Sequence, residues 1–413
     1  MNPTLRNTFR HTVRGTFRDT FLDPPGTGGG GRRIRLPRPS GGEPGALPVV
    51  AGLALIAVVF GSLNGHFLSA ENLTNLALQM AATGTIALGI VLVLLLGEID
   101  LSVGSVSGLC AVVMTLLNVH RHVPAGVAVL LALGAAALIG LAHGLMFTVL
   151  RMPSFVVTLA GLIGWQGLML YLLGREGTIN LPFDGPIAKL SDTWLPTWLS
   201  WTIVFVAGAS YLVTALLVRR ARIGAGLPVS GPLPLALRTA GLVVLLGAAV
   251  AVMSGDRGVP LTLVIFGGLV VLLDLVLRLT LPGRWVYAVG GDAEAARRAG
   301  IAVTRVRVLV FVGASVLAGA GGILAASRLS AVNQSSGGSD ILLNAIAAAV
   351  IGGTSLFGGR GRAYAALLGI LVIQSVANGM LLLNVDSSVR FMVTAGVLAL
   401  AVAIDSAARG GRR

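Results

Sequence analysis

The sequence predicts an all-α, polytopic integral membrane protein with about twelve transmembrane helices, some of them broken or re-entrant. The 413-residue chain is 55% hydrophobic and only 11% charged, with a mean hydropathy of +0.89. Soluble domains carry roughly 25% charged residues. Glycine is abundant, with 57 residues, as expected where helices pack closely in lipid.

The apolar stretches that predict the helices follow one another from Ala46 onward, each about 17–28 residues long and so able to cross a bilayer. They cover residues 46–63, 76–97, 101–118, 123–150, 154–173, 200–218, 236–253, 259–281, 304–326, 341–358, 361–383 and 389–406. We expect breaks or re-entrant turns in 76–97 and 341–358, because both contain glycine and polar residues.

The chain divides into a membrane domain at 46–406 and two flanking tails at 1–45 and 407–413. In the basic first tail, Arg and an apolar residue recur every four positions, so a helix lying on an anionic membrane surface is one interpretation. A disordered tail is the interpretation that we favour, because Thr and Gly15 are poor helix formers. No cleavable signal peptide is expected, since the first apolar run starts near Ala46.

The net charge of +14 predicts orientation rather than a nucleic-acid partner. Positive residues of membrane proteins collect on cytoplasmic loops. Arginines cluster in alternate loops, which places both termini and the polar loop 283–303 in the cytoplasm. The sequence therefore predicts a multi-pass protein of the cytoplasmic (inner) membrane, in contact with membrane lipid.

No catalytic residues, metal site or cofactor are predicted, so the chain is not expected to be an enzyme. Its one lysine, Lys189, lacks the glycine-rich context of an ATP-binding phosphate loop. The one cysteine, Cys110, excludes an intrachain disulfide. The five histidines show no metal-ligand spacing within one helix. Any work driven by ATP must therefore use another subunit.

The polar loop 283–303 contains Glu294-Ala295-Ala296, followed after three residues by Gly300. Glu and Ala favour a helix, and glycine suits the position just past a helix end. This string resembles the coupling loop of ABC importer permeases. Further segments resemble the monosaccharide permeases of that family, so the resemblance covers about residues 46–406. These segments are 97–105 (Gly-Glu-Ile-Asp-Leu-Ser-Val-Gly-Ser), 153–159 (Pro-Ser-Phe-Val-Val-Thr-Leu), 345–355, 358–361, 378–379 and 403–405.

The resemblance implies a permease subunit that forms a monosaccharide path and couples to a separate ABC ATPase through Glu294, Ala295, Ala296 and Gly300. It also implies a second permease copy in a homodimer and an extracytoplasmic sugar-binding protein. An extra hairpin at about 236–281 resembles the xylose branch and implies a pentose such as xylose. The chain departs from the family at Glu98, where glycine is usual, and at 342–344, where two usual carboxylates are absent. Two alternatives remain: a branched-chain amino acid ABC permease and a secondary transporter that needs no ATPase.

Polar residues in or beside the spans are the candidates for lining the path, because a sugar that leaves water needs substitute hydrogen bonds. Asp100 is interpreted either as a lining or gating residue or as a cap of the helix that begins at Leu101 or Ser102. Gln374 and Asn378 share a helix face and either line the path or bond a neighbouring helix. The candidates are Asp100, Ser102, Gln166, Asn344, Gln374 and Asn378.

Overall fold

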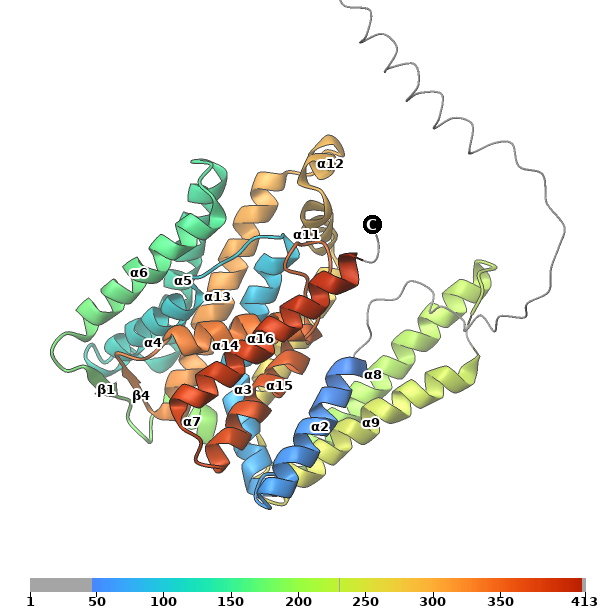
Figure 1. Cartoon of the computed structure of the whole chain (residues 1–413), viewed down its shortest axis with the longest axis horizontal. Coiled ribbons are helices and arrows are strands. Elements are labelled where there is room, and N and C mark those ends of the chain that lie inside the picture. Colours follow the sequence, from blue (N-terminus) through green and yellow to red (C-terminus); the bar gives the residue numbers. More distant parts are fainter. Residues whose placement is uncertain (1–46, 230, 411–413) are drawn as a thin grey trace, which may run out of the picture. The chain divides into compact units, whose positions relative to one another are not determined.

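The computed structural model describes residues 47–229 and 231–410, so the predicted basic tail at 1–45 lies outside the described residues. The described part contains fifteen helices and four short strands, which confirms the all-α prediction (Figure 1). The helices are α2 (Leu47–Leu63), α3 (Ala70–Leu95), α4 (Val103–Val119), α5 (Ala125–Thr148), α6 (Ser154–Leu173), α7 (Pro186–Asp192), α8 (Thr197–Gly224), α9 (Pro232–Ser254), α10 (Leu261–Leu279), α11 (Leu281–Gly291), α12 (Ala293–Arg298), α13 (Val303–Leu329), α14 (Ser339–Ile351), α15 (Tyr364–Leu382) and α16 (Ser387–Gly410).

Each predicted apolar stretch coincides with one helix of the structure. Eight helices of the described chain are long and apolar enough to cross a membrane, namely α3, α5, α6, α8, α9, α10, α13 and α15. The apolar helices α4 and α14 are shorter, with 17 and 13 residues. The chain is therefore a polytopic membrane protein in which short helices pack among the full-length ones.

The expected break in 76–97 is wrong, because α3 runs without interruption over 26 residues. Its glycines serve packing instead of ending the helix. A methyl group at Gly84 would lie 2.5 Å from the Phe266 ring, and one at Gly89 would lie 2.7 Å from the Ala314 carbonyl oxygen. Small residues that let backbones approach closely are typical of membrane helix contacts.

The expected break in 341–358 is confirmed. Helix α14 ends at Ile351, and a loop of residues 352–363 leads to α15. Gly353 follows with a φ of +99°, a conformation that glycine adopts without steric cost. A methyl group at Gly369 would lie 1.7 Å from the Ala348 carbonyl oxygen, so α15 and α14 pack backbone against backbone.

The two ends of the membrane domain are named here by the elements that lie beside the first and last residues of α13. Helix α13 packs along α3, α4 and α5, with α12 just before its first residue. Just after its last residue, β4 (Ala331–Asn333) pairs antiparallel with β1 (Thr178–Asn180). Near that end of α13, the Ser327 hydroxyl donates to the Ser191 hydroxyl of α7, at 2.9 Å. We call these the α12 end and the α7 end (Figure 1).

The predicted extra hairpin consists of α9 and α10, joined at the α7 end by a turn with Gly258 and by β3 (Val259–Pro260). Strand β3 pairs with β2 (Trp194–Leu195), which precedes α8. Helix α9 packs on α8 and α3, and α10 packs on α3. The Asp274 and Arg278 side chains of α10 form an i, i+4 ion pair with a distance of 3.0 Å.

Candidate functional site

The turn at residues 96–102 joins α3 to α4 and is the point where several elements meet. Gly97 has a φ of +77°, and a methyl group there would lie 3.1 Å from the Phe357 carbonyl oxygen. The Gly359 N–H donates to the Leu95 carbonyl, at 2.9 Å. The 96–102 turn is therefore fixed against the loop that follows α14.

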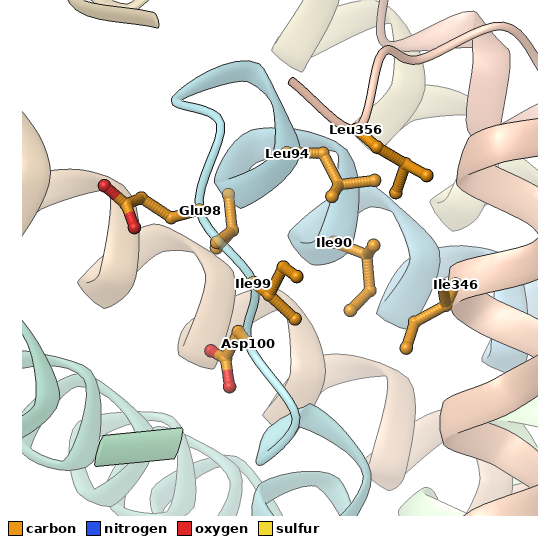
Figure 2. Close-up of a pocket in the computed structure, with 8 residues that line it drawn as sticks. Ile90, Leu94, Glu98, Ile99, Asp100, Ile346 and Leu356 are labelled. Atoms are coloured by element: carbon orange, nitrogen blue, oxygen red, sulfur yellow. The ribbon is translucent and has the colours of Figure 1, made fainter. Parts of the chain in front are cut away.

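A small apolar cavity lies beside this turn. Figure 2 shows Ile90, Leu94, Ile346 and Leu356 on one side of the segment, while the Glu98 carboxylate points to the other side. The cavity measures about 80 Å³. Pockets that enclose a small-molecule ligand measure roughly 300 Å³ or more. One copy of the chain therefore does not enclose a ligand-sized site at this position.

The Asp100 side chain begins a buried hydrogen-bonded chain. It is 2% exposed, and its Oδ1 accepts from the Ser102 N–H at 2.8 Å and from the Ser102 hydroxyl at 2.6 Å. Asp100 thus closes the turn just before α4, which begins at Val103. The cap position of α4 is Ser102, two residues after Asp100. Its Oδ2 is buried and has no hydrogen-bond partner among the described residues.

His143 of α5 extends this chain towards α6. Its Nδ1 lies 3.4 Å from the Ser102 hydroxyl, and its Nε2 accepts the Trp165 indole N–H at 3.0 Å. The indole nitrogen is only a donor, so Nε2 must carry a lone pair and the ring proton resides on Nδ1. Asp100 and Ser102 are among the predicted path residues, whereas His143 and Trp165 are not, because nothing in the local sequence pairs them.

Glu98 anchors the same turn to two other helices. Its Oε1 lies 3.4 Å from Nη2 of Arg307 on α13, and its Oε2 accepts the Ser154 hydroxyl of α6 at 2.7 Å. The Arg307 guanidinium lies over the Phe147 ring of α5, 4.7 Å from the ring centre. Glu98 is therefore the centre of a cluster that joins the turn after α3 to α5, α6 and α13.

The predicted short helix is present as α12. Asp292 precedes it, and its Oδ1 accepts the N–H groups of Glu294 and Ala295, both at 2.9 Å. The Glu294 carboxylate forms ion pairs with Arg297 at 3.0 Å and with Arg298 at 3.3 Å. These contacts satisfy the first N–H groups of a helix that is too short to be stable by itself.

Gly300 ends this segment with a φ of +84°. Its N–H donates to the Arg297 carbonyl at 3.0 Å, and the next N–H, of Ile301, donates to the Ala296 carbonyl at 3.0 Å. Such bonds satisfy the last carbonyls of a helix. Ala296 is buried against the core, whereas Glu294 and Ala295 are exposed. The α12 helix therefore presents one face outward and is held by the other.

Helix α11, which precedes α12, packs against the end of α3, just before the 96–102 turn. A methyl group at Gly290 would lie 1.8 Å from the Leu95 carbonyl oxygen and 2.8 Å from the Gly359 nitrogen. The Tyr287 hydroxyl donates to the Gly361 carbonyl at 2.9 Å. The end of α3, helix α11 and the loop after α14 are thus in direct backbone contact, which the sequence analysis did not predict.

Comparisons with known proteins identify the family of the chain. The model of the family described as the permease component of the branched-chain amino acid transport system matches residues 72–403. The chain belongs to this family of ABC transporter permeases. It is 32% identical over 359 residues to the xylose transport system permease protein XylH of Haemophilus influenzae, covering 87% of this chain and 95% of that protein.

Two further relatives support the same branch. The permease is 32% identical over 366 residues to XylH of Escherichia coli K12, covering 87% and 91% of the two chains. It is 31% identical over 360 residues to the ribose import permease protein RbsC of the same strain, covering 87% and 92%. The resemblance to the monosaccharide permeases is thus confirmed. No solved structure matches the permease.

The remaining predicted path residues of the permease lie on other helices, and none of them hydrogen-bonds to Asp100 among the described residues. Gln166, Asn344 and Gln374 are half-buried and lie on α6, α14 and α15, respectively. Asn378 is buried, and its amide exchanges two hydrogen bonds with Asn72 of α3, at 2.8 and 3.0 Å. Of the two interpretations of Asn378, the structure shows the bond to a neighbouring helix.

The Asn72–Asn378 pair gives a first testable prediction. Replacing Asn378 by leucine is expected to lower the free energy of unfolding by about 1–3 kcal/mol, because it leaves the buried Asn72 amide short of partners. Replacing both asparagines by leucine is expected to recover much of that loss. Thermal unfolding of the detergent-solubilised permease measures both effects. A double variant that loses the sum of the two single losses would contradict this account of the pair.

Proposed function

We propose that the permease is the membrane-spanning subunit of an ATP-driven monosaccharide importer, and that its substrate is a pentose such as xylose. The named relatives transport xylose and ribose. The α9–α10 hairpin is the extra hairpin at about 236–281, which resembles the xylose branch. The observation that carries the proposal is α12, an exposed and capped helix that directly follows α11, whose Gly290 is in backbone contact with the end of α3 and with the loop after α14. ATP hydrolysis takes place on a separate subunit.

The α12 end faces the cytoplasm in this proposal, and both termini lie on that side. Helix α8 supports this orientation. Trp198 and Trp201 are exposed near its start, and Arg219 and Arg220 lie near its end. The 18 residues from Trp201 to Arg219 span about 27 Å of helix, close to the roughly 30 Å of the hydrocarbon core. Tryptophans belong at membrane interfaces and arginines on the cytoplasmic side.

The exposed face of α12 fits a groove on a partner protein, as short helices commonly do. Its outward residues are Glu294, Ala295, Arg297 and Arg298. We assign this groove to the ABC ATPase, which would grip α12 and displace it during the ATP cycle. Gly300 belongs to the coupling segment because its backbone conformation ends the helix.

A second copy of the permease would complete the path, because the cavity in one chain is too small for a sugar. Half-buried Gln166, Asn344 and Gln374 are candidates for hydrogen bonds to the moving sugar, with Asp100 and Ser102 near its cytoplasmic exit. An extracytoplasmic sugar-binding protein would dock on the α7 end. There Phe183 is 82% exposed and Trp198 is also exposed, so large side chains are available for contact.

The coupling proposal is tested by deleting residues 294–296 and, separately, by replacing Gly300 with valine. Valine is strained at a positive φ, although nothing crowds the position itself. Both variants are expected to insert into membranes but to lose co-purification of the ATPase and ATP-driven uptake of radiolabelled xylose. Undiminished uptake in the deletion variant would refute the coupling role. Uptake by the permease alone that collapses with an uncoupler would establish a secondary transporter.

Branched-chain amino acids are the second candidate substrate class, because the matching family is described as the permease component of the branched-chain amino acid transport system. Competition for uptake by unlabelled xylose, ribose and leucine separates the two classes. Inhibition by leucine alone would replace the sugar in this proposal and would leave the coupling role of α12 unaffected.

A further inference from the structure

The connection between α12 and α13 is short and closed by hydrogen bonds. Four residues separate the two helices, and the Val303 N–H donates to the Ile301 carbonyl at 2.9 Å. Helix α12 packs directly against α13, and the Ala296, Val303 and Val306 side chains are buried in the main apolar core. A displacement of α12 therefore moves the first turns of α13 with it.

Arg307 lies in the second turn of α13 and makes the ion pair with Glu98 described above. The two side chains are 26% and 17% exposed, so water screens their attraction only in part. The Arg307 Nε is buried without a hydrogen-bond partner among the described residues, and the Phe147 ring covers the guanidinium. These contacts restrict the position of the Arg307 guanidinium, so the guanidinium moves together with α13.

Glu98 in turn belongs to the 96–102 turn, one residue before Ile99 of the cavity wall. The Thr158 hydroxyl of α6 lies 3.3 Å from the Ile99 carbonyl oxygen, and the Ser154 hydroxyl of the same helix donates to the Glu98 carboxylate. Apolar contacts between α13 and α3 have little directional preference. The Glu98–Arg307 pair is directional, because its charged atoms must face each other.

We propose that the ion pair of Glu98 and Arg307, held by Ser154, transmits the displacement of α12 to the 96–102 turn and so couples the ATPase to the cytoplasmic end of the path. The inference rests on the proposed function and deepens it. Glu98 and Arg307 are positioning residues in this scheme, since their charges face each other and the Glu98 carboxylate points away from the cavity (Figure 2).

The test uses the full transporter, with ATPase and binding protein, reconstituted in proteoliposomes and supplied with radiolabelled xylose. The single variants are Glu98→Gln and Arg307→Gln. The double variants are Glu98→Gln with Arg307→Gln, and the charge exchange Glu98→Arg with Arg307→Glu. Arg305→Gln is the matched control, because Arg305 is an exposed arginine two residues before Arg307 in α13. The measured quantity is xylose transported per ATP hydrolysed, alongside the thermal unfolding midpoint of each variant.

Each single substitution in the pair is expected to lower the xylose-to-ATP ratio about fivefold to tenfold, the size of a typical coupling between sites. The double variant is expected to be no worse than either single one, and the charge exchange to recover part of the ratio. Arg305→Gln should leave it within about twofold. The inference would be overturned if the losses of the two single variants multiplied in the double variant. It would also be overturned if the loss of the xylose-to-ATP ratio simply followed the loss of thermal stability across the variants. Failure of the wild-type permease to bind the ATPase would instead refute the proposed function itself.

Discussion

Replacing Gly290 by valine is expected to abolish ATP-driven uptake. The first side-chain carbon would lie 1.8 Å from the Leu95 carbonyl oxygen and 2.8 Å from the Gly359 nitrogen. Both are backbone atoms, and the Gly359 N–H donates to the Leu95 carbonyl oxygen. Neither atom can therefore move aside as a flexible side chain would. Overpacking in a tight core costs about 1–3 kcal/mol or more, and here it separates α11 from the end of α3.

The neighbouring Gly291 supplies the control for this prediction. It lies in the same helix, and a methyl group there would meet nothing within 4 Å. Gly291→Val is expected to keep uptake within about twofold of the wild type, as surface substitutions usually do. Uptake of radiolabelled xylose, normalised to the amount of permease in the membrane, measures both variants. Equal loss in the two variants would show that the close approach of α11 to α3 does not matter for function.

The positions of the membrane helices could be predicted from the sequence because apolar length is a property of each segment by itself. Every predicted stretch coincides with a helix for this reason. The role of an individual glycine could not be predicted, since it depends on the partner helix. Gly84 and Gly89 suggested a break in α3, whereas the structure shows that they admit the Phe266 ring and the Ala314 backbone.

The candidate site was predictable to the extent that its contacts are local. Helix α12 and the bond from Ser102 to Asp100 involve residues at most a few positions apart. The partners of Glu98 lie 56 and 209 positions away, at Ser154 and Arg307, and no periodicity links them. The one available signal was the glutamate itself. A charged residue between two apolar stretches needs a partner, and only the fold identifies which arginine supplies it.

Helix α12 carries exposed side chains, and its stability depends strongly on Asp292. Helices shorter than about 12–15 residues are marginal in water, and α12 has six. The Asp292 carboxylate accepts two of its first N–H groups, at 2.9 Å each. Loss of such a cap costs about 0.5–2 kcal/mol, which for a marginal helix is enough to shift the population towards the unfolded segment.

We therefore expect Asp292→Ala to lower ATP-driven xylose uptake and the affinity for the ATPase about tenfold, the change that 1.4 kcal/mol produces. Asp292→Asn keeps a side-chain oxygen that can accept the same bonds, so its affinity should stay within about threefold of the wild type. Titration of the purified permease with the ATPase measures the affinities. Equal losses in the alanine and asparagine variants would indicate that the ATPase contacts the Asp292 charge directly. Unchanged affinity in the alanine variant would mean that a folded α12 is not what the ATPase recognises.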